Sequence, residues 1–251
     1  MKIIITNSYE EMSKTAAREI AMQILTKPDS VIGFATGSTP LGLYKELIRY
    51  YKEGIIDFSQ ITAFNLDEYI GLDRSSDQSY VSFMADNLFD AVNLPPENRN
   101  IPSGIATDMN AECLRYEKAI ETAGGIDIQI LGIGRNGHIG FNEPGTPFDT
   151  ITHTLDLTEE TISDNTRFFE KKNDVPTRAI SMGMKTIMRA RKILLLASGE
   201  NKRAAIRGTI NGKISTDLPA SVLQLHCNAV VITDKEAGAD QIGRASCRER
   251  V

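Results

Sequence analysis

The sequence contains few cysteines and no long apolar segment, and both absences narrow the class of protein. Only Cys113, Cys227 and Cys247 occur among 251 residues, and they form neither a CxxC pair nor an even-numbered set. A disulfide framework or a zinc ribbon is therefore not expected. No stretch approaches the roughly 20 apolar residues that a membrane helix needs. The apolar run at residues 3–5 is too short for a signal-peptide core. We expect a soluble, cytoplasmic protein.

A basic segment is also missing from most of the chain. There are 28 Lys and Arg against 33 Asp and Glu, so the formal net charge is −5. This acidic balance argues against nucleic acid and anionic membranes as main partners. No internal repeat, low-complexity stretch or flexible linker divides the chain. We therefore interpret residues 1–241 as a single domain whose partner is a small molecule.

The last ten residues, 242–251, differ in character from the rest. They carry three Arg within seven residues, and their codons can be written as a translated sequencing-adaptor sequence. We therefore interpret this tail as foreign to the natural reading frame. A basic C-terminal tail is the alternative, and resequencing from independent DNA separates the two.

Short apolar runs alternate with amphipathic stretches along the rest of the chain. Strands are predicted at residues 2–6, 31–35, 61–65, 126–133, 192–197 and 229–233. Helices are predicted between them at residues 9–25, 41–52, 80–92, 110–123 and 201–211. This alternation is typical of a three-layer α/β sandwich with a mostly parallel central sheet. Ligands bind such sheets at the carboxyl ends of the strands, so the residues directly after each strand are the first candidates for a site.

The strand at residues 31–35 is followed by a turn of small residues. Thr36, Gly37, Ser38 and Thr39 precede a proline and an amphipathic helix. Free backbone N–H groups at such a helix start, together with hydroxyl groups, can bind a phosphate. The turn matches neither a Walker A loop nor GxGxxG. A plain capped turn between strand and helix is the alternative.

Two carboxylates, Asp67 and Glu68, follow the strand at residues 61–65. A carboxylate at this place can serve as a general base, a ribose ligand or a metal ligand. A helix-capping acid is the alternative.

The strand at residues 126–133 is followed by the richest cluster of polar groups. Asn136, His138 and Glu143 lie within eight residues, among several glycines that leave room for a ligand. An imidazole is the usual proton shuttle near neutral pH, and a carboxylate can orient it and stabilise its charged form. A metal site or a structural histidine remains the alternative. The other two histidines, His153 and His226, lack such neighbours and are expected to be structural.

Two cations complete the predicted site. Lys202 follows the strand at residues 192–197, and Arg167 precedes two phenylalanines in a polar stretch. Both could hold a phosphate, the arginine in a bidentate fork and the lysine as a point charge. Taken singly, each could equally be a surface charge.

Together these blocks closely resemble the glucosamine-6-phosphate deaminase (glucosamine-6-phosphate isomerase) family. The resemblance extends over residues 1–237, and its most specific blocks are FNLDEYIGL at 64–72 and GHIGFNEP at 137–144; TGSTPL at 36–41, SYVSFM at 79–84, NTRFF at 165–169 and LQLH at 223–226 also match. The family implies a Rossmann-like fold, and conversion of glucosamine 6-phosphate and water to fructose 6-phosphate and ammonia. Family members are often oligomers.

The resemblance also implies roles for the candidate residues. Asp67 is similar to the base that moves a proton between C2 and C1 of the opened sugar. His138 is similar to the acid/base that opens the ring, positioned by Asn136 and Glu143. The turn at residues 36–39, Arg167 and Lys202 resemble the 6-phosphate site. The reaction is redox-neutral, so neither a cofactor nor a metal is implied.

The chain departs from the family pattern in two places. Many relatives carry Asp where this chain has Asn136, and we expect Asn136→Asp to be tolerated because an amide can also orient the histidine. Allosteric members carry basic residues after the Glu-Pro motif, where they bind N-acetylglucosamine 6-phosphate. Residues 148–156 of this chain contain no Arg or Lys, which predicts no activation through that site.

The polar segment at residues 157–177 is interpreted as a mobile lid that excludes water, or as a surface excursion.

Two alternatives to a deaminase stay open. A 6-phosphogluconolactonase shares the glycine-rich blocks, although it typically continues with a Ser/Leu-rich stretch instead of Phe-Asn-Glu143-Pro. A catalytically silent sugar-phosphate sensor is the second alternative, but the chain shows no lost catalytic residue and no added DNA-binding domain.

Overall fold

The structure is a computed structural model that describes residues 1–165 and 175–241 of the chain. Its strands are β1 (Lys2–Thr6), β2 (Val31–Phe34), β3 (Thr62–Asn65), β4 (Asp67–Tyr69), β5 (Arg99–Asn100), β6 (Ile128–Leu131), β7 (His153–Asp156), β8 (Arg178–Ser181), β9 (Lys192–Ala197) and β10 (Ala229–Asp234). Its α-helices are α1 (Tyr9–Thr26), α2 (Leu41–Lys52), α3 (Tyr80–Asn87), α4 (Met109–Thr122), α5 (Glu159–Asn165), α6 (Met184–Met188) and α7 (Arg203–Asn211). Each of the predicted strands and helices has its counterpart among these elements.

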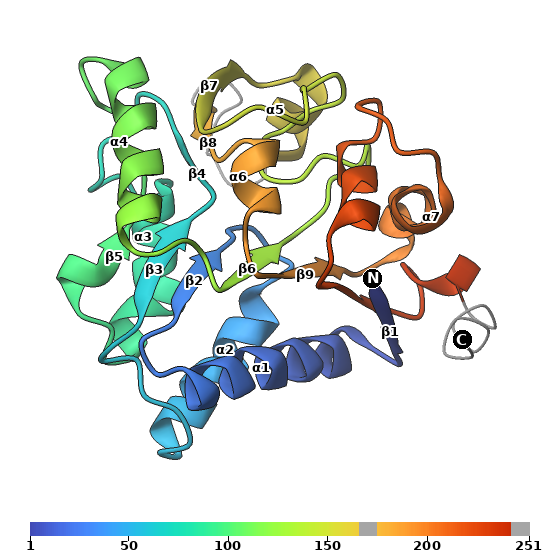
Figure 1. The fold of residues 1–251 in the computed structure, drawn as a ribbon, viewed down its shortest axis with the longest axis horizontal. Coiled ribbons are helices and arrows are strands. Elements are labelled where there is room, and N and C mark those ends of the chain that lie inside the picture. Colours follow the sequence, from blue (N-terminus) through green and yellow to red (C-terminus); the bar gives the residue numbers. More distant parts are fainter. Residues whose placement is uncertain (166–174, 242–251) are drawn as a thin grey trace.

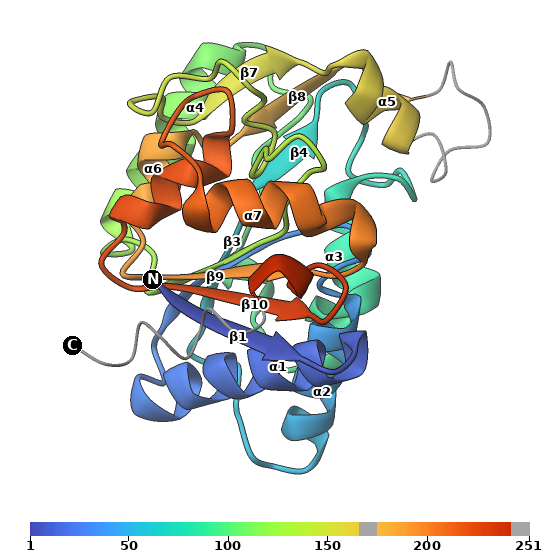
Figure 2. The same ribbon diagram turned by 90° about the vertical axis from the view of Figure 1, so that its right-hand side faces the viewer.

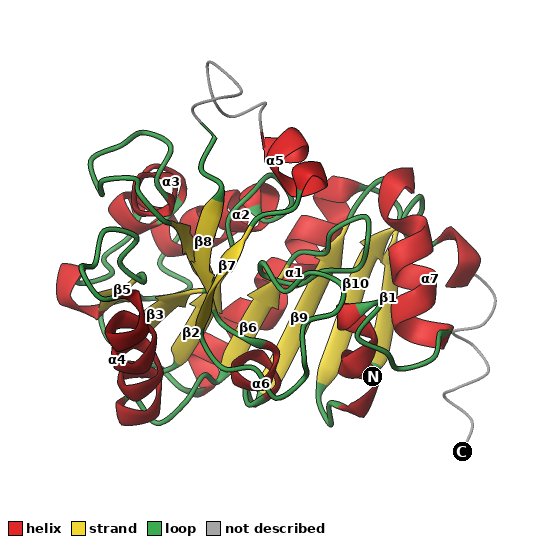
Figure 3. Ribbon diagram, turned by 90° about the horizontal axis from the view of Figure 1, so that it is seen from above, coloured by secondary structure: helices red, strands yellow, loops and turns green. Residues whose placement is uncertain are grey.

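A seven-stranded parallel sheet forms the centre of the molecule (Figures 1 and 3). Its strand order is β1-β10-β9-β6-β2-β3-β5, and every pairing between neighbours is parallel. Helices α1 and α2 cover one face, while α4, α6 and α7 cover the other (Figure 2). Because helices cover both faces, the central strands need apolar side chains on both sides, and all four residues of β2 and of β6 are buried. The predicted three-layer α/β architecture is confirmed.

A second, three-stranded sheet was not predicted. It has the order β4-β8-β7, its pairings are antiparallel, and it lies on the side of the parallel sheet that carries α4, α6 and α7 (Figure 2). Its strands are three or four residues long and contain charged or polar residues in the sequences DEY, HTLD and RAIS. Such short mixed segments carry no apolar run and too few residues to show alternation. Pairing with distant parts of the chain is what makes them strands.

The two sheets are joined next to the expected site. Only Leu66 separates β3 of the parallel sheet from β4 of the small sheet, and its carbonyl accepts the backbone N–H of Met182 at 2.7 Å, just after β8. The carboxyl ends of β2, β6 and β9 lie on the same edge as this junction, because β2 pairs with β3 and β6 pairs with both β2 and β9, all in parallel. No helix within residues 1–165 and 175–241 is long and apolar enough to cross a membrane.

Candidate functional site

A cleft of about 410 Å³ lies at the carboxyl ends of the parallel strands. Its lining brings together four of the predicted features: the turn at residues 36–39, Asp67, His138 and Lys202. These residues follow β2, β3, β6 and β9 respectively. Arg167 lies outside the described residues, as does part of the segment predicted to be a lid; the described part of that segment includes α5 and the turn before β8.

The turn after β2 is held open toward the cleft by a glycine and by a tyrosine from α1. Gly37 has a φ of +93°, a conformation that L side chains rarely adopt, so glycine is required there. The Tyr9 hydroxyl donates to the carbonyls of Ser38 and Thr39 at 3.1 Å each, and it accepts the Gly42 N–H at 2.8 Å. Both carbonyls are thereby paired with Tyr9, which does not line the cleft, and this favours binding of an anion by the turn.

Asp67 begins β4 and faces the cleft with only 6% of its surface exposed. Burial raises the pKa of its carboxyl group to about 8, and the neighbouring charge of Glu68 adds to the shift. A carboxyl group with this pKa takes up and releases a proton near neutral pH, as a general base requires.

Glu68 is the helix-capping acid that the sequence offered as the alternative for this pair. Because successive side chains of a strand point to opposite faces, it does not line the cleft with Asp67. Its carboxylate accepts the backbone N–H groups of Tyr69 at 2.8 Å, Tyr80 at 3.0 Å and Val81 at 3.2 Å. The last two belong to the first turn of α3. One carboxylate of the pair therefore faces the ligand space, and the other ties β4 to α3.

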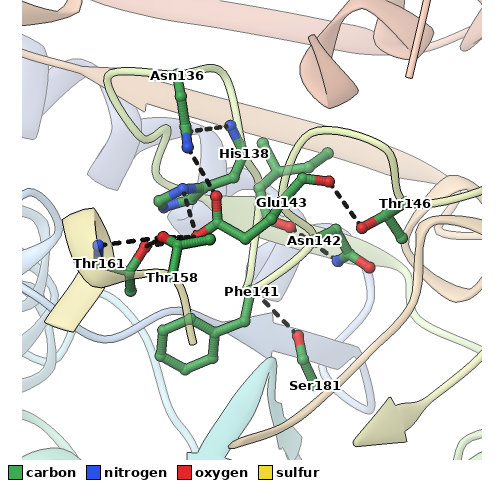
Figure 4. A network of polar contacts seen from close by, with 10 residues as sticks. Asn136, His138, Phe141, Asn142, Glu143, Thr146, Thr158, Thr161 and Ser181 are labelled. Atoms are coloured by element: carbon green, nitrogen blue, oxygen red, sulfur yellow. Dashed lines mark hydrogen bonds and ion pairs between the residues drawn. The ribbon is translucent and has the colours of Figure 1, made fainter. Parts of the chain in front are cut away.

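Asn136, His138 and Glu143 form one hydrogen-bonded cluster after β6 (Figure 4). The Glu143 Oε1 atom lies 3.4 Å from Nδ1 of His138. The Asn136 amide donates to Oε2 of Glu143 at 2.7 Å, and its carbonyl oxygen accepts the backbone N–H of His138 at 3.2 Å. Asn136 therefore orients the carboxylate and the backbone of the histidine, and not its ring.

Glu143 is kept ionised by its neighbours. Burial alone would raise its pKa, but the neighbouring imidazole of His138, with hydrogen bonds from Thr161 and Asn136, brings the pKa down to about 2. The imidazole packs on Gly134, where an added Cβ would come within 2.4 Å of the ring. The ring is thus confined between a glycine and an anionic carboxylate, which suits a proton shuttle.

Lys202 reaches the cleft through a turn that a buried carboxylate organises. Asp234, at the end of β10, accepts the Ser198 hydroxyl at 2.5 Å and the Gly199 N–H at 2.9 Å. Gly199 has a φ of +90°. This turn leads directly into the short 3-10 helix Glu200–Lys202, so the position of the lysine depends on Asp234.

The structure adds residues that the sequence did not single out. Arg135 and Thr161 line the cleft, and so do the aromatic rings of Tyr80 and Phe141, which stack with an interplanar angle of 11°. Tyr80 and Phe141 lie inside the blocks on which the family resemblance rests, and that signal could have identified them. No local pattern marked Thr161, since it approaches Glu143 only through the fold.

The remaining histidines have backbone partners outside the cleft, as expected of structural residues. Nε2 of His226 lies 2.8 Å from the carbonyl oxygen of Ala190, and Nδ1 of His153 lies 3.1 Å from that of Ile151.

The geometry refines the expectation for Asn136→Asp. The new carboxylate would replace an amide that donates to Glu143 at 2.7 Å, so two negative groups would share the space beside His138. Like charges favour uptake of a proton, which raises the pKa of Glu143 and of the new carboxyl group. We expect the activity of the site to stay within about tenfold of that of the unmodified protein, because one pKa unit corresponds to about 1.4 kcal/mol. Complete loss of activity would contradict this expectation.

Comparisons with known proteins agree on one family. The family model described as glucosamine-6-phosphate isomerases/6-phosphogluconolactonase matches residues 6–232. A glucosamine-6-phosphate deaminase from Clostridium botulinum is 55% identical over 239 residues, which are 95% of this chain and 98% of the relative. One from Thermoanaerobacter sp. is 57% identical over 239 residues, with 95% and 94% covered.

Solved structures are similar over the same extent. A monomeric glucosamine-6-phosphate deaminase superimposes with a TM-score of 0.94 at 47% identity, covering 95% of this chain and 99% of the other. A 6-phosphogluconolactonase from Trypanosoma brucei gives a TM-score of 0.73 at 18% identity, covering 95% and 98%. The second likeness shows a shared fold and nothing more.

Proposed function

The chain belongs to the glucosamine-6-phosphate isomerase/6-phosphogluconolactonase family, and from this premise we propose that it is a glucosamine-6-phosphate deaminase. It converts glucosamine 6-phosphate and water to fructose 6-phosphate and ammonia, in amino-sugar catabolism. The observation that carries the proposal is the cleft itself. Its lining combines a buried carboxylate of raised pKa, an imidazole paired with an anionic carboxylate, and a turn suited to a phosphate.

His138 would open the sugar ring. Opening requires that a proton leave the C1 hydroxyl and that one arrive at the ring oxygen, and an imidazole can perform both transfers in turn. While the ring nitrogen carries the proton, the anionic Glu143 beside it stabilises the positive charge. Asn136 holds that carboxylate in place.

Asp67 would then move a proton along the opened sugar. It removes the C2 proton while the C1 carbonyl oxygen takes up a proton, which gives an enol with a double bond between C1 and C2. The same carboxyl group then returns its proton to C1 while the C2 nitrogen loses one. This leaves an imine at C2, which water hydrolyses to the ketone with release of ammonia. A single positioned group of this kind contributes typically about 10²–10⁴-fold to the rate. All charges are handled by protons, so the reaction needs no electron carrier.

The phosphate would supply binding energy far from the reacting carbons. The turn at residues 36–39 and Lys202 line the same cleft, and Arg167 is proposed to join them. Binding of the phosphate orients the sugar between Asp67 and His138, so that part of the binding energy is used to position the reacting carbons. Because the chain has a net negative charge, the cations that bind the phosphate must be clustered at the site. We also propose that the segment at residues 157–177 closes over the sugar.

A lactonase is the less supported alternative. Ester hydrolysis removes no proton from carbon, so it gives no purpose to a carboxylate of raised pKa such as Asp67.

The 47%-identical structural relative is a deaminase and is monomeric, which supports a monomer over the oligomer that the family allows. We further propose that the protein acts in the cytoplasm.

A coupled assay for ammonia release from glucosamine 6-phosphate tests the proposal. Release of ammonia with formation of fructose 6-phosphate is expected. Hydrolysis of 6-phosphogluconolactone without ammonia release would establish the lactonase instead. Tight binding of the sugar phosphate with neither product would identify a sensor.

We also expect no activation by N-acetylglucosamine 6-phosphate. Residues 148–156 contain no Arg or Lys, and Arg178 on the neighbouring strand is paired with Asp156 at 3.6 Å. An anionic activator therefore finds little uncompensated positive charge in this stretch. Initial rates should depend hyperbolically on substrate, with or without the activator. A sigmoidal curve that the activator makes hyperbolic would contradict the expectation.

A further inference from the structure

A chain of hydroxyl groups links helix α5 to the carboxylate of Glu143 (Figure 4). The Thr161 hydroxyl donates to Oε1 of Glu143 at 2.5 Å, and it accepts from the Thr158 hydroxyl at 3.1 Å. The backbone N–H of Thr161 in turn donates to the Thr158 hydroxyl oxygen at 3.2 Å. Thr161 is buried and belongs to the beginning of α5. Its hydroxyl is therefore held in one orientation by the helix start.

The same carboxylate oxygen faces the imidazole. Nδ1 of His138 lies 3.4 Å from Oε1 of Glu143, beyond the usual 2.7–3.2 Å range of N–H···O hydrogen bonds. This nitrogen is buried and has no closer hydrogen-bond partner among the described residues. The Thr158 hydroxyl also donates to this oxygen, at 3.4 Å. The hydroxyl of Thr161 thus makes the shortest of the three contacts to Oε1.

We propose that Thr161 is a positioning residue for ring opening, and that its hydroxyl sets how strongly Glu143 holds the proton-carrying ring of His138. The inference rests on the proposed function. A hydroxyl donor takes up part of the negative charge of the carboxylate, so less of it is available to the imidazole. The ring can then give up its proton to the sugar more readily. Thr161 also lines the cleft, so its place is fixed relative to the ligand space.

A substitution of Thr161 leaves the other charges around Glu143 and His138 unchanged. Asp67, Arg135 and Lys202 face the same cleft from β4, the loop after β6 and the turn after β9. Glu159 in α5 is exposed. Thr161→Val removes a hydroxyl but no charge and little volume. A change in the titration of His138 in this variant therefore reports the lost hydrogen bond to Glu143.

The test compares Thr161→Val with Thr161→Ser and with Thr146→Val. Loss of a hydrogen bond to a charged group predicts a fall in kcat of about 10- to 100-fold in Thr161→Val, with KM changed by less than about threefold because the phosphate turn is untouched. Thr161→Ser should recover most of kcat. Thr146→Val is the matched control, since that hydroxyl donates to the backbone carbonyl of Glu143 at 2.7 Å and leaves the carboxylate alone. It should keep the kcat of the unmodified protein.

An NMR titration of the histidine rings gives a readout that does not depend on activity. Without the competing donor, both Glu143 and His138 become more basic, so the His138 signal should titrate at higher pH in Thr161→Val and at the original pH in Thr161→Ser. The signal is assigned by its loss in His138→Gln. A lower kcat with an unchanged His138 titration would overturn the positioning role. Absence of ammonia release by the unmodified protein would overturn the proposed function, while the titration would still decide the contact.

Discussion

Replacing Asp67 by Asn should nearly abolish ammonia release and at the same time make the protein more stable. The amide keeps the size of the side chain but cannot accept the C2 proton, so we expect kcat to fall by about 10²–10⁴-fold. The stability gain follows from burial, which raises the pKa of Asp67 to about 8. A carboxyl group whose burial destabilises the fold in this way is retained for chemistry and not for folding.

The gain in stability should depend on pH with a definite sign. The folded-state pKa of Asp67 is raised, from an ordinary value of 3.8 to about 8. The unfolded chain therefore ionises first, and stability falls as pH rises from about 4 to about 8. Asp67→Asn removes this dependence, so its advantage in Tm should be small at pH 4 and full by pH 8. Each kcal/mol corresponds to about 2–4 °C in a domain of this size, which thermal unfolding followed by circular dichroism can resolve.

Glu68→Gln is the matched control. Burial raises the pKa of Glu68 as well, but its carboxylate accepts three backbone N–H groups. The side-chain amide of glutamine would point an N–H group at one of these backbone N–H donors. Stability should therefore fall, by about 1–3 kcal/mol. An equal gain of Tm in both variants would contradict the different roles that we assign to these neighbours.

Replacing His138 by Gln should also reduce ammonia release by about 10²–10⁴-fold, because the site loses its proton shuttle. His153→Gln is the control, since His153 hydrogen-bonds to a backbone carbonyl at the start of β7. It should leave the rate nearly unchanged. Coupled assays of ammonia release from glucosamine 6-phosphate measure both variants.

The Asp67→Asn and His138→Gln variants should differ in one partial reaction, the exchange of the C1 proton with solvent. In heavy water with fructose 6-phosphate and ammonium, the C1 proton exchanges when a base acts on the open-chain sugar. A small open-chain fraction forms without the enzyme, so His138→Gln should retain this exchange while Asp67→Asn loses it. Loss of exchange in both variants would contradict the division of labour between ring opening and proton transfer.

The parallel sheet and its helices could be predicted because their signals are local. Strand β9 contains an uninterrupted run of buried apolar residues, which marks a strand covered on both faces. Strands β4, β7 and β8 contain no such run, and long-range pairing alone orders them. The sequence therefore indicated where the cleft lies, but not that Asp67 belongs to a second sheet.

Prediction of the site was likewise limited to residues with a local signal. Asp67, His138 and Lys202 follow predicted strands, and the cleft brings them together as expected. Asn136 was expected to orient the imidazole, whereas its amide donates to Glu143. Thr161 lies 18 positions beyond Glu143 along the chain, and only the docking of α5 against the loop makes them neighbours.

The placement of Asp67 on the small sheet has a mechanical consequence. The proposed base, Asp67, belongs to β4, while His138 and the turn at residues 36–39 follow strands of the parallel sheet. The position of Asp67 relative to His138 is therefore set by how the two sheets pack together, and the backbone hydrogen bond from Met182 to Leu66 is one of the contacts that join them. A substitution in the core between the two sheets, without contact to the sugar, is expected to change the reaction rate by shifting one sheet relative to the other. In such an architecture, the placement of the site residues depends on the packing between the two sheets as much as on the residues themselves.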